Sequence, residues 1–296
     1  MKIELRDLEY FAVICEHGHL GRAAESLDMS QSALSKSLRR IEDAVGAKVV
    51  MRTPKGVELT SVGSALRAQV QRLRLAVDDV IHEAQDVGQG RAGHLRIGVT
   101  PGFIEYPFAP ACRDLLKNAP KLSVTVKVST TDLLAALCNG ELDLLVSPML
   151  IPANEDVAHD YLFEDEFVVY ASAKHRYAHS KRVSMHDLAH EGWTLSAPTL
   201  ASQALERAFV TSGFPAPRIV LATTSIILTR YAVAECGLLG YAPERVLREG
   251  AAGIPLVRLS VPELKWTRRG GIHYRKSAYL SPAARQLIEL LKSITR

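Results

Sequence analysis

The stretch LGRAAESLDMSQSALSKSLRRIEDAVGAKVVMRTPKGVELT, residues 20–60, decides the fold of the first part of this chain. Its small residues predict a short helix over 22–27, which ends at a two-residue break. A second helix follows, capped by Ser30 or Gln31 and continued by good helix formers to Ala44. Two helices joined so closely indicate a helix-turn-helix.

The second helix has an apolar face and a polar face. Large aliphatic side chains recur at helical spacing and predict the buried face: Leu34, Leu38, Ile41 and Val45. The opposite face carries short polar groups near the helix start and cations further along. In a recognition helix, the N-terminal residues reach base edges and later basic residues contact phosphates. The polar face therefore predicts contact with double-stranded DNA.

A solvated helical hairpin is the alternative interpretation of this segment. A helix that is merely soluble usually carries interleaved acids, whereas residues 29–40 contain no Asp or Glu. Beyond a left-handed cap expected at Gly46, the basic turn 52–56 lies between two strand-like runs and has the shape of a wing. We therefore predict a winged helix-turn-helix. Its candidate DNA-binding residues are Ser30, Gln31, Ser32, Ser35, Lys36, Arg39, Arg52 and Lys55.

Residues 31–63, QSALSKSLRRIEDAVGAKVVMRTPKGVELTSVG, resemble the DNA-binding signature of LysR-type transcriptional regulators. The resemblance covers essentially the whole chain. It implies that the second helix enters the major groove and that the wing lies along the DNA backbone. Ser32 stands where many members have proline, which is a tolerated variation at the start of a helix.

Composition and charge are those of a soluble protein with two or three domains. The 296 residues are 47% hydrophobic and 23% charged, with a formal net charge of +4. Acids and bases are equal in number over residues 1–60, so the basic character is local to the recognition face. The N-terminus lacks an apolar signal segment and no run approaches a membrane span. We therefore expect a cytoplasmic protein with no membrane partner.

The four cysteines, Cys15, Cys112, Cys138 and Cys236, show no CxxC spacing. We interpret them as buried thiols in a reducing compartment, with neither a disulfide framework nor a metal site. Some LysR-type members sense peroxide through a cysteine pair in the second half of the chain. Only Cys236 lies in the second half here, which argues against that mechanism.

A single long helix is predicted from 61 to about 87. Its apolar residues follow alternating steps of four and three and form a heptad seam: Leu66, Val70, Leu73, Val77, Val80, Ala84 and Val87. We expect the seam to pair with a second copy, because two-fold DNA sites need two recognition helices. The resemblance implies the same homodimer, and packing on its own domain is the alternative. Residues 88–93 formally match GxGxxG, but they follow a helix, so we interpret them as a hinge.

From His94 on, strands and helices alternate. Strands at 95–99, 122–128 and 143–147, with helices between them, predict a βαβαβ unit with a parallel sheet. A second series of strands and helices follows, beginning with a strand over 166–172, and the chain closes with a strand over 271–275 and a helix over 282–293. Two such α/β lobes resemble the periplasmic-binding-protein-like effector domain of LysR-type regulators.

The predicted organisation is thus a winged helix-turn-helix, a long linker helix and a two-lobed α/β domain. Its bounds are 1–60 for the DNA-binding domain, 61–90 for the linker or dimerisation helix with its hinge, and 91–296 for the effector-binding domain. Lobe I spans about 91–161 and 268–296, and lobe II spans about 162–267.

Hydroxyl side chains follow several of the predicted strands. In open parallel sheets, ligands bind at the carboxyl ends of the strands, although Ser and Thr are also routine helix caps. Together these side chains would converge on one cleft between the lobes. The resemblance supports Thr100, Thr130, Thr131, Ser147 and Ser202 as lining it. The candidate effector-binding residues are Thr100, Phe103, Ser129, Thr130, Thr131, Ser147, Ser196, Leu200, Ser202, Thr223 and Thr224.

The charge that we expect on the effector depends on whether Lys or Arg occurs near these positions. LysR-type members that bind aromatic dicarboxylates often have an arginine just after the third strand, where this chain has Ser147 and Pro148. No Lys or Arg occurs at the predicted strand ends, so we expect a mono-anionic or neutral polar effector. An arginine from elsewhere, such as Arg230, is the alternative. We interpret a basic cluster over residues 265–276 as solvated strand ends.

Catalytic motifs are missing from the sequence. It contains no HExxH, GxSxG, SxxK or phosphate-binding loop, and the histidines are scattered. We therefore expect no enzyme, no cofactor and no metal, but a transcriptional regulator that binds an imperfect palindromic operator and a small-molecule effector. An enzyme and an architectural DNA binder are the alternatives. The resemblance favours a homotetramer with RNA polymerase as a candidate further partner, and it leaves activation or repression open.

Overall fold

The computed structural model describes residues 3–54, 56–88, 93–149, 154–195, 199–245, 247 and 255–296. The chain forms two compact units, Met1–Ala84 and Gln85–Arg296. The candidate residues Lys55 and Ser196, and residues 89–92 of the predicted hinge, lie outside the described residues.

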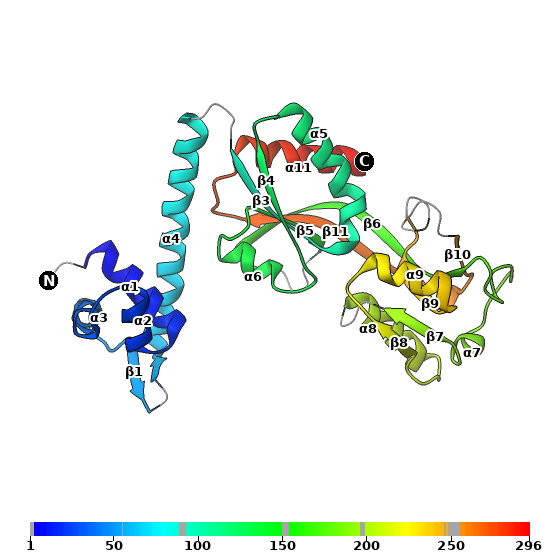
Figure 1. The fold of residues 1–296 in the computed structure, drawn as a ribbon, viewed down its shortest axis with the longest axis horizontal. Helices are drawn as coiled ribbons and strands as arrows, with labels where there is room; N and C mark the ends of the chain where they lie inside the picture. The colour runs from blue at the N-terminus through cyan, green and yellow to red at the C-terminus, as the bar shows by residue number, and fades with distance from the viewer. Residues whose placement is uncertain are drawn as a thin grey trace. The chain divides into compact units, whose positions relative to one another are not determined.

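The first unit confirms the predicted winged helix-turn-helix. Its elements are α1 (Leu5–His17), α2 (Leu20–Ser26), α3 (Gln31–Val45), β1 (Val50–Thr53), β2 (Gly56–Leu59) and most of α4 (Ser61–Gly88). Strands β1 and β2 pair antiparallel as the wing, and α1 packs against both α2 and α3 (Figure 1). Leu34, Leu38 and Ile41 of α3 are buried as predicted. Val45 is not, and is 40% exposed, because it is the last helical residue before Gly46 turns the chain away with a φ of 74°.

Part of the heptad seam of α4 packs on its own domain, and part of it is exposed. Val70 is buried in the core of the first unit and Leu66 packs against that core. Leu73, Val77 and Val80 are 39%, 38% and 65% exposed. The first turn of α4 lies unusually close to the wing, since a Cβ on Gly63 would stand 1.8 Å from the carbonyl oxygen of Val49. The interpretation of the whole seam as a free dimerisation face is therefore wrong at its N-terminal end.

The second unit is a two-lobed α/β structure. Its strands are β3 (His94–Val99), β4 (Ser123–Val128), β5 (Leu144–Pro148), β6 (Val157–Ser172), β7 (Gly192–Leu195), β8 (Arg218–Ala222), β9 (Leu239–Pro243), β10 (Leu256–Arg258) and β11 (Trp266–Arg275). Its helices are α5 (Ala109–Asn118), α6 (Leu133–Cys138), α7 (Met185–Leu188), α8 (Leu200–Thr211), α9 (Ile226–Cys236) and α11 (Pro282–Thr295). Short helical turns cover Pro101–Phe103 (η1), Ile104–Phe108 (η2) and Pro262–Leu264 (η3).

One mixed sheet runs through both lobes in the order β4-β3-β5-β11-β6-β9-β7-β8, with β10 on β6. The predicted parallel βαβαβ unit is confirmed for β3, β4 and β5. Strands β6 and β11 are antiparallel and long enough to take part in both lobes. One hydrophobic core includes buried residues of α5 and α11, and another includes buried residues of β7 and α8. Both β6 and β11 begin earlier than predicted, because charged residues interrupt the alternation of their apolar residues.

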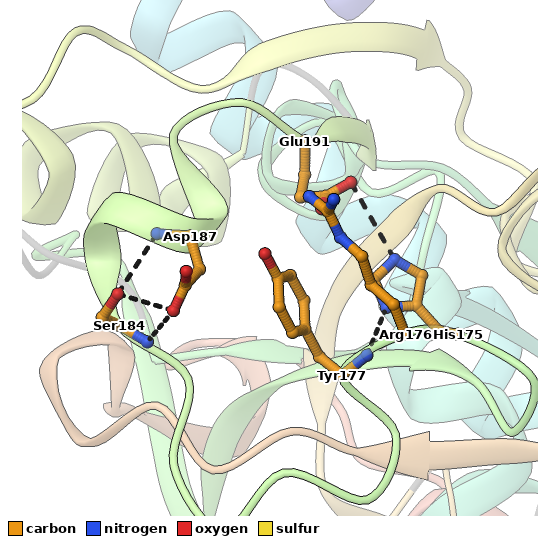
Figure 2. A network of polar contacts seen from close by, with 6 residues as sticks. All are labelled: His175, Arg176, Tyr177, Ser184, Asp187 and Glu191. Atoms are coloured by element: carbon orange, nitrogen blue, oxygen red, sulfur yellow. Dashed lines mark hydrogen bonds and ion pairs between the residues drawn. The ribbon is translucent and has the colours of Figure 1, made fainter.

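A polar network braces the segment of lobe II between β6 and β7 (Figure 2). The Ser184 hydroxyl accepts the Asp187 backbone N–H at 3.2 Å, and the Asp187 carboxylate accepts the Ser184 hydroxyl at 2.6 Å, which caps α7. Glu191 pairs with Arg176 and lies 3.9 Å from His175. None of these residues lines the cavity described below.

Candidate nucleic-acid interface and ligand cleft

The polar face of α3 is exposed in the first unit. Gln31, Ser32, Lys36 and Arg39 are exposed and Ser35 is half-buried. The Ser30 hydroxyl caps α3 by accepting the Ala33 backbone N–H at 3.2 Å, so its side chain is already engaged. Arg52 of the wing is exposed as well. The predicted residues thus share one helix face and the adjoining wing, with Lys55 outside the described part.

A buried carboxylate that was not among the predicted site residues ties α3 to α1. Asp7 is 1% exposed and accepts the Ser37 hydroxyl at 2.6 Å and the Arg40 Nε–H at 3.1 Å. It also accepts the Glu4 backbone N–H at the start of α1. The Arg40 guanidinium is the largest cause that lowers the pKa of Asp7 to about 2. Asp7 therefore fixes the polar face of α3 in its orientation.

The wing is held at both ends. Glu42, 8% exposed, pairs with Lys48 at 2.6 Å and accepts the Val49 backbone N–H at 3.3 Å. At the other end, the Val57 backbone N–H donates to the Gly18 carbonyl at 2.8 Å. Gly56 has a φ of 133°, and a Cβ there would stand 2.3 Å from the Gly18 oxygen, so only glycine fits this approach.

A cavity of about 520 Å³ lies in the second unit, lined by residues of both predicted lobes. The structure brings most of the candidate effector residues to it: Thr100, Thr130, Thr131, Ser147, Leu200, Ser202 and Thr224. They come from the carboxyl ends of β3, β4 and β5 and from the starts of α8 and α9. This arrangement is the one expected of ligand sites in open parallel sheets.

Three candidates do not line the cavity. Phe103 is fully buried in the lobe I core. The Ser129 hydroxyl donates to Asp132 at 2.9 Å and accepts the Thr131 backbone N–H, and the Thr223 hydroxyl accepts the Ser225 backbone N–H at 3.1 Å. Ser129 and Thr223 thus serve the local turns before α6 and α9, which is the alternative role of hydroxyls at helix starts.

Several lining residues were missed. Tyr170, Trp266 and Thr194 line the cavity, and the buried Thr194 hydroxyl has no hydrogen-bond partner. Arg268 also lines it, with a side chain only 10% exposed. The alternative of an arginine that reaches the cleft from elsewhere in the chain therefore applies, with Arg268 in place of Arg230. The interpretation of residues 265–276 as solvated holds for Lys265, Arg269 and Lys276, which are exposed. It is wrong for Arg275, which is buried, and for Arg268, which is only 10% exposed.

Arg230, the alternative cation, is buried but does not line the cavity. Its Nη1–H and Nη2–H groups donate to the two carboxylate oxygens of Glu105, each at 2.8 Å. Glu105 belongs to η2 and Arg230 to α9, so this bidentate ion pair joins the two predicted lobes.

The cysteines are less buried than predicted. All four are free; Cys15, Cys112 and Cys138 are half-buried and Cys236 is exposed. Burial raises the pKa of Cys15 to about 11 and raises the pKa values of Cys112 and Cys138, which disfavours their reactive thiolates. In the described part of the chain, no three His, Cys, Asp or Glu side chains come together as a metal site. Over the same ranges, none of the helices has the length and apolar character needed to cross a membrane.

Comparison with known proteins identifies both units. Residues 5–64 match the family model "Bacterial regulatory helix-turn-helix protein, lysR family", and residues 88–295 match "LysR substrate binding domain". The chain therefore belongs to the LysR family of DNA-binding transcriptional regulators, whose members bind small-molecule effectors and are not enzymes.

Individual relatives agree with this membership. The uncharacterized HTH-type transcriptional regulator YnfL of Escherichia coli K12 is 32% identical over 204 residues, 67% of each chain. The DNA-binding transcriptional dual regulator OxyR of the same strain is 29% identical over 299 residues, 98% of this chain and 95% of OxyR. A structure of a full-length OxyR variant from Pseudomonas aeruginosa covers 100% of this chain and 95% of its own, with 24% identity and a TM-score of 0.65, which shows a shared fold.

Proposed function

We propose that α3 is the recognition helix of an operator-binding dimer. Gln31, Ser32 and Ser35 contact base edges in the major groove, and Lys36 and Arg39 contact phosphates on either side. Ser30 positions the helix start, while Arg52 and Lys55 of the wing contact the neighbouring backbone. The observation that carries this proposal is the exposed polar face of α3, held opposite a buried face by Asp7.

The test is operator binding by the full chain on its own upstream intergenic region, measured over a range of salt concentrations. Gln31→Ala and Ser35→Ala should reduce the preference for operator over random DNA by about 1–3 kcal/mol each. Arg39→Ala should weaken binding to both DNAs and lower the slope of the salt dependence by about one. Asp43→Ala, a change at an exposed acid of the same helix, is the control. Equal losses of specificity in Gln31→Ala, Ser35→Ala and Arg39→Ala contradict the assignment of base contacts to Gln31 and Ser35 and of phosphate contacts to Arg39.

The effector site of this proposal is the 520 Å³ cavity between lobe I (about 91–161 and 268–296) and lobe II (about 162–267). Its lining of hydroxyls, apolar side chains and one arginine, Arg268, suits a mono-anionic or neutral polar molecule. Thr100→Val should spare operator binding and blunt the response to the effector. Unchanged induction in that variant refutes the role of Thr100.

The proposed dimer forms through α4. Leu73, Val77 and Val80 are exposed, and Leu73 and Val77 also line a groove of about 300 Å³ between α1 and α4. A face of this kind is protected by a second copy of the same helix. Val80→Glu should shift the mass in solution toward the monomer and weaken operator binding, because two half-sites then no longer act together. An unchanged mass in light scattering excludes this face.

The proposed assembly is a cytoplasmic homotetramer that regulates transcription together with RNA polymerase. Effector binding changes the angle between the lobes and, through the hinge near residues 88–93, the spacing of the recognition helices and the bend of the DNA. A footprint on the intergenic region that shortens or shifts with one metabolite supports this account and identifies the ligand. A footprint that no compound alters leaves DNA binding in place and removes the effector role.

A further inference from the structure

Three residues of one short segment in lobe I each contact a different arginine. The segment is residues 103–106, at the end of η1 and the start of η2, and the contacts join Phe103 to Arg268, Glu105 to Arg230 and Tyr106 to Arg245. The guanidinium groups of Arg268 and Arg245 each lie 4.4 Å from the centre of the ring that they contact. The arginines come from β11, from α9 and from the segment after β9, so distant parts of the chain meet here.

The ion pair of Glu105 and Arg230 includes a buried cation. Arg230 is 3% exposed, whereas Glu105 is 46% exposed. The two Nη groups donate to separate carboxylate oxygens, each at 2.8 Å, which is the bidentate geometry of a strong ion pair. Within the described ranges, Glu105 is the carboxylate that lies within ion-pair distance of Arg230. An arrangement that separates the two residues would leave the buried cation without its counter-charge, which is costly.

Each partner of this ion pair is fixed in its own lobe. The hydroxyl of Tyr106, the residue after Glu105, donates to the Ile294 carbonyl of α11 at 2.9 Å, so the segment is tied to lobe I. Arg230 lies in α9, which packs against β7 and β9 of lobe II. A change in the angle between the lobes therefore moves Glu105 and Arg230 relative to each other.

The ion pair also lies beside the cavity. Gly102, in the turn before Glu105, lines the cavity, and so does Thr229, the neighbour of Arg230 in α9. Burial raises the pKa of the cavity residue Tyr170, and the nearby charge of Arg230 opposes this effect, so Arg230 lies near the cavity wall. A ligand that displaces η1 or α9 would therefore change the geometry of the ion pair.

We propose that the ion pair of Glu105 and Arg230 is a latch between the lobes, which holds the angle of the ligand-free effector domain. An effector that displaces either side weakens the latch and releases a second angle. The inference rests on the proposed effector function and extends it to two positioning residues outside the cavity. A stronger latch leaves fewer unliganded molecules at the second angle, so its strength sets the basal state of the regulator and the apparent affinity for the effector.

The test measures the angle between the lobes in the full-length protein without any ligand. Spin labels are attached at Lys117→Cys on α5 and Glu206→Cys on α8, both exposed positions, after the four native cysteines are replaced by alanine. Labelled chains are mixed with an excess of unlabelled protein, so that the distance from pulsed electron paramagnetic resonance is the one within a single chain. The protein with an intact ion pair should give one narrow distance distribution.

Removal of either charge should release the lobes. Glu105→Gln and Arg230→Met should each raise the population at a second distance about 5- to 30-fold. Exchange of the charges, Glu105→Arg with Arg230→Glu, should restore the narrow distribution. Glu164→Gln is the matched control, because Glu164 is 45% exposed and pairs with Arg269 at the same 2.8 Å, but between two neighbouring strands. It should keep the narrow distribution.

The variant Arg230→Met separates a latch from a contact that only stabilises the fold. It removes the buried cation together with the need for a counter-charge, so its thermal midpoint should stay near that of the wild type while its distance distribution changes. An unchanged distribution in Arg230→Met, or no recovery in a folded protein with exchanged charges, overturns the proposal. So does a change in Glu164→Gln as large as that in Glu105→Gln.

Operator footprints of the same variants, recorded without effector, distinguish the latch from the proposed function. If the parent protein does not bind the operator but the variants release the lobes, only the proposed function fails. If the parent protein binds the operator and no variant releases the lobes, only the latch fails. Released lobes together with an altered footprint support both.

Discussion

Asp7→Asn should loosen α3, the proposed recognition helix, from α1. In the wild type the Asp7 carboxylate accepts hydrogen bonds from Ser37 and Arg40 of α3 and from the Glu4 backbone N–H. An amide in its place keeps one acceptor oxygen and brings an NH₂ group against donors that need an acceptor. The ion pair with Arg40 is lost completely.

The expected loss follows from the pKa of Asp7, which is lowered from 3.8 to about 2. A tenfold change in proton affinity between the folded and unfolded states corresponds to ~1.4 kcal/mol, so the carboxylate contributes at most about 2.5 kcal/mol. The Arg40 side chain is 36% exposed, so screening by solvent reduces the figure to about 1–2 kcal/mol. Because the folded-state pKa is depressed, this stability is present above about pH 4 and is lost as the pH falls toward about 2.

Hydrogen exchange of the full chain, measured over Gln31–Val45, gives the local free energy of opening. Asp7→Asn should lower it by about 1–2 kcal/mol at pH 7, with little change in α11. The difference between wild type and variant should hold from pH 7 to pH 5 and shrink below pH 4. Asp43→Asn, at an exposed acid of the same helix, is the control. A loss no larger than in the control, or one that persists unchanged to pH 2, refutes the role of Asp7.

Two further substitutions test close contacts of the fold. Gly63→Ala would stabilise an ordinary helix by up to about 1 kcal/mol. Here the new Cβ meets the Val49 oxygen at 1.8 Å, so we expect a loss of about 1–3 kcal/mol in unfolding of the first unit; a gain contradicts the packing of α4 on the wing. Glu105→Gln removes the charge that pairs with buried Arg230 and should destabilise the second unit by about 1–2 kcal/mol, because Glu105 is itself 46% exposed. An unchanged thermal midpoint shows that the lobes do not depend on this ion pair.

The winged helix-turn-helix was predictable because its signals are local. A cap at Ser30, an aliphatic stripe along α3 and a glycine at 46 each act within a few residues, and the structure has all three. The Asp7 contacts were not predictable in the same way, since Asp7 and Ser37 are thirty positions apart in the chain. Nothing in the local sequence marks Asp7 as more than a helix-start acid.

The hydroxyl lining of the cleft followed from topology, since strand ends and helix starts meet in this fold. Topology does not distinguish a lining hydroxyl from a capping one, and the predicted set therefore included Ser129 and Thr223. Arg268 was missed because the predicted last strand began at 271, whereas β11 begins at Trp266. In the longer strand, Trp266 and Arg268 lie two positions apart and on the same face, and both line the cavity.

The position of Arg268 connects the cavity to the strands that link the lobes. Arg268 and Asp165 are register partners on β11 and β6, the two strands that take part in both lobes. The register of these strands shifts between Gly270 and Gly271, and such irregularities bend strands. A ligand in the proposed effector cavity thus meets β11 at Trp266 and Arg268, so a small change in the pairing of the two strands becomes a change in the angle between the lobes.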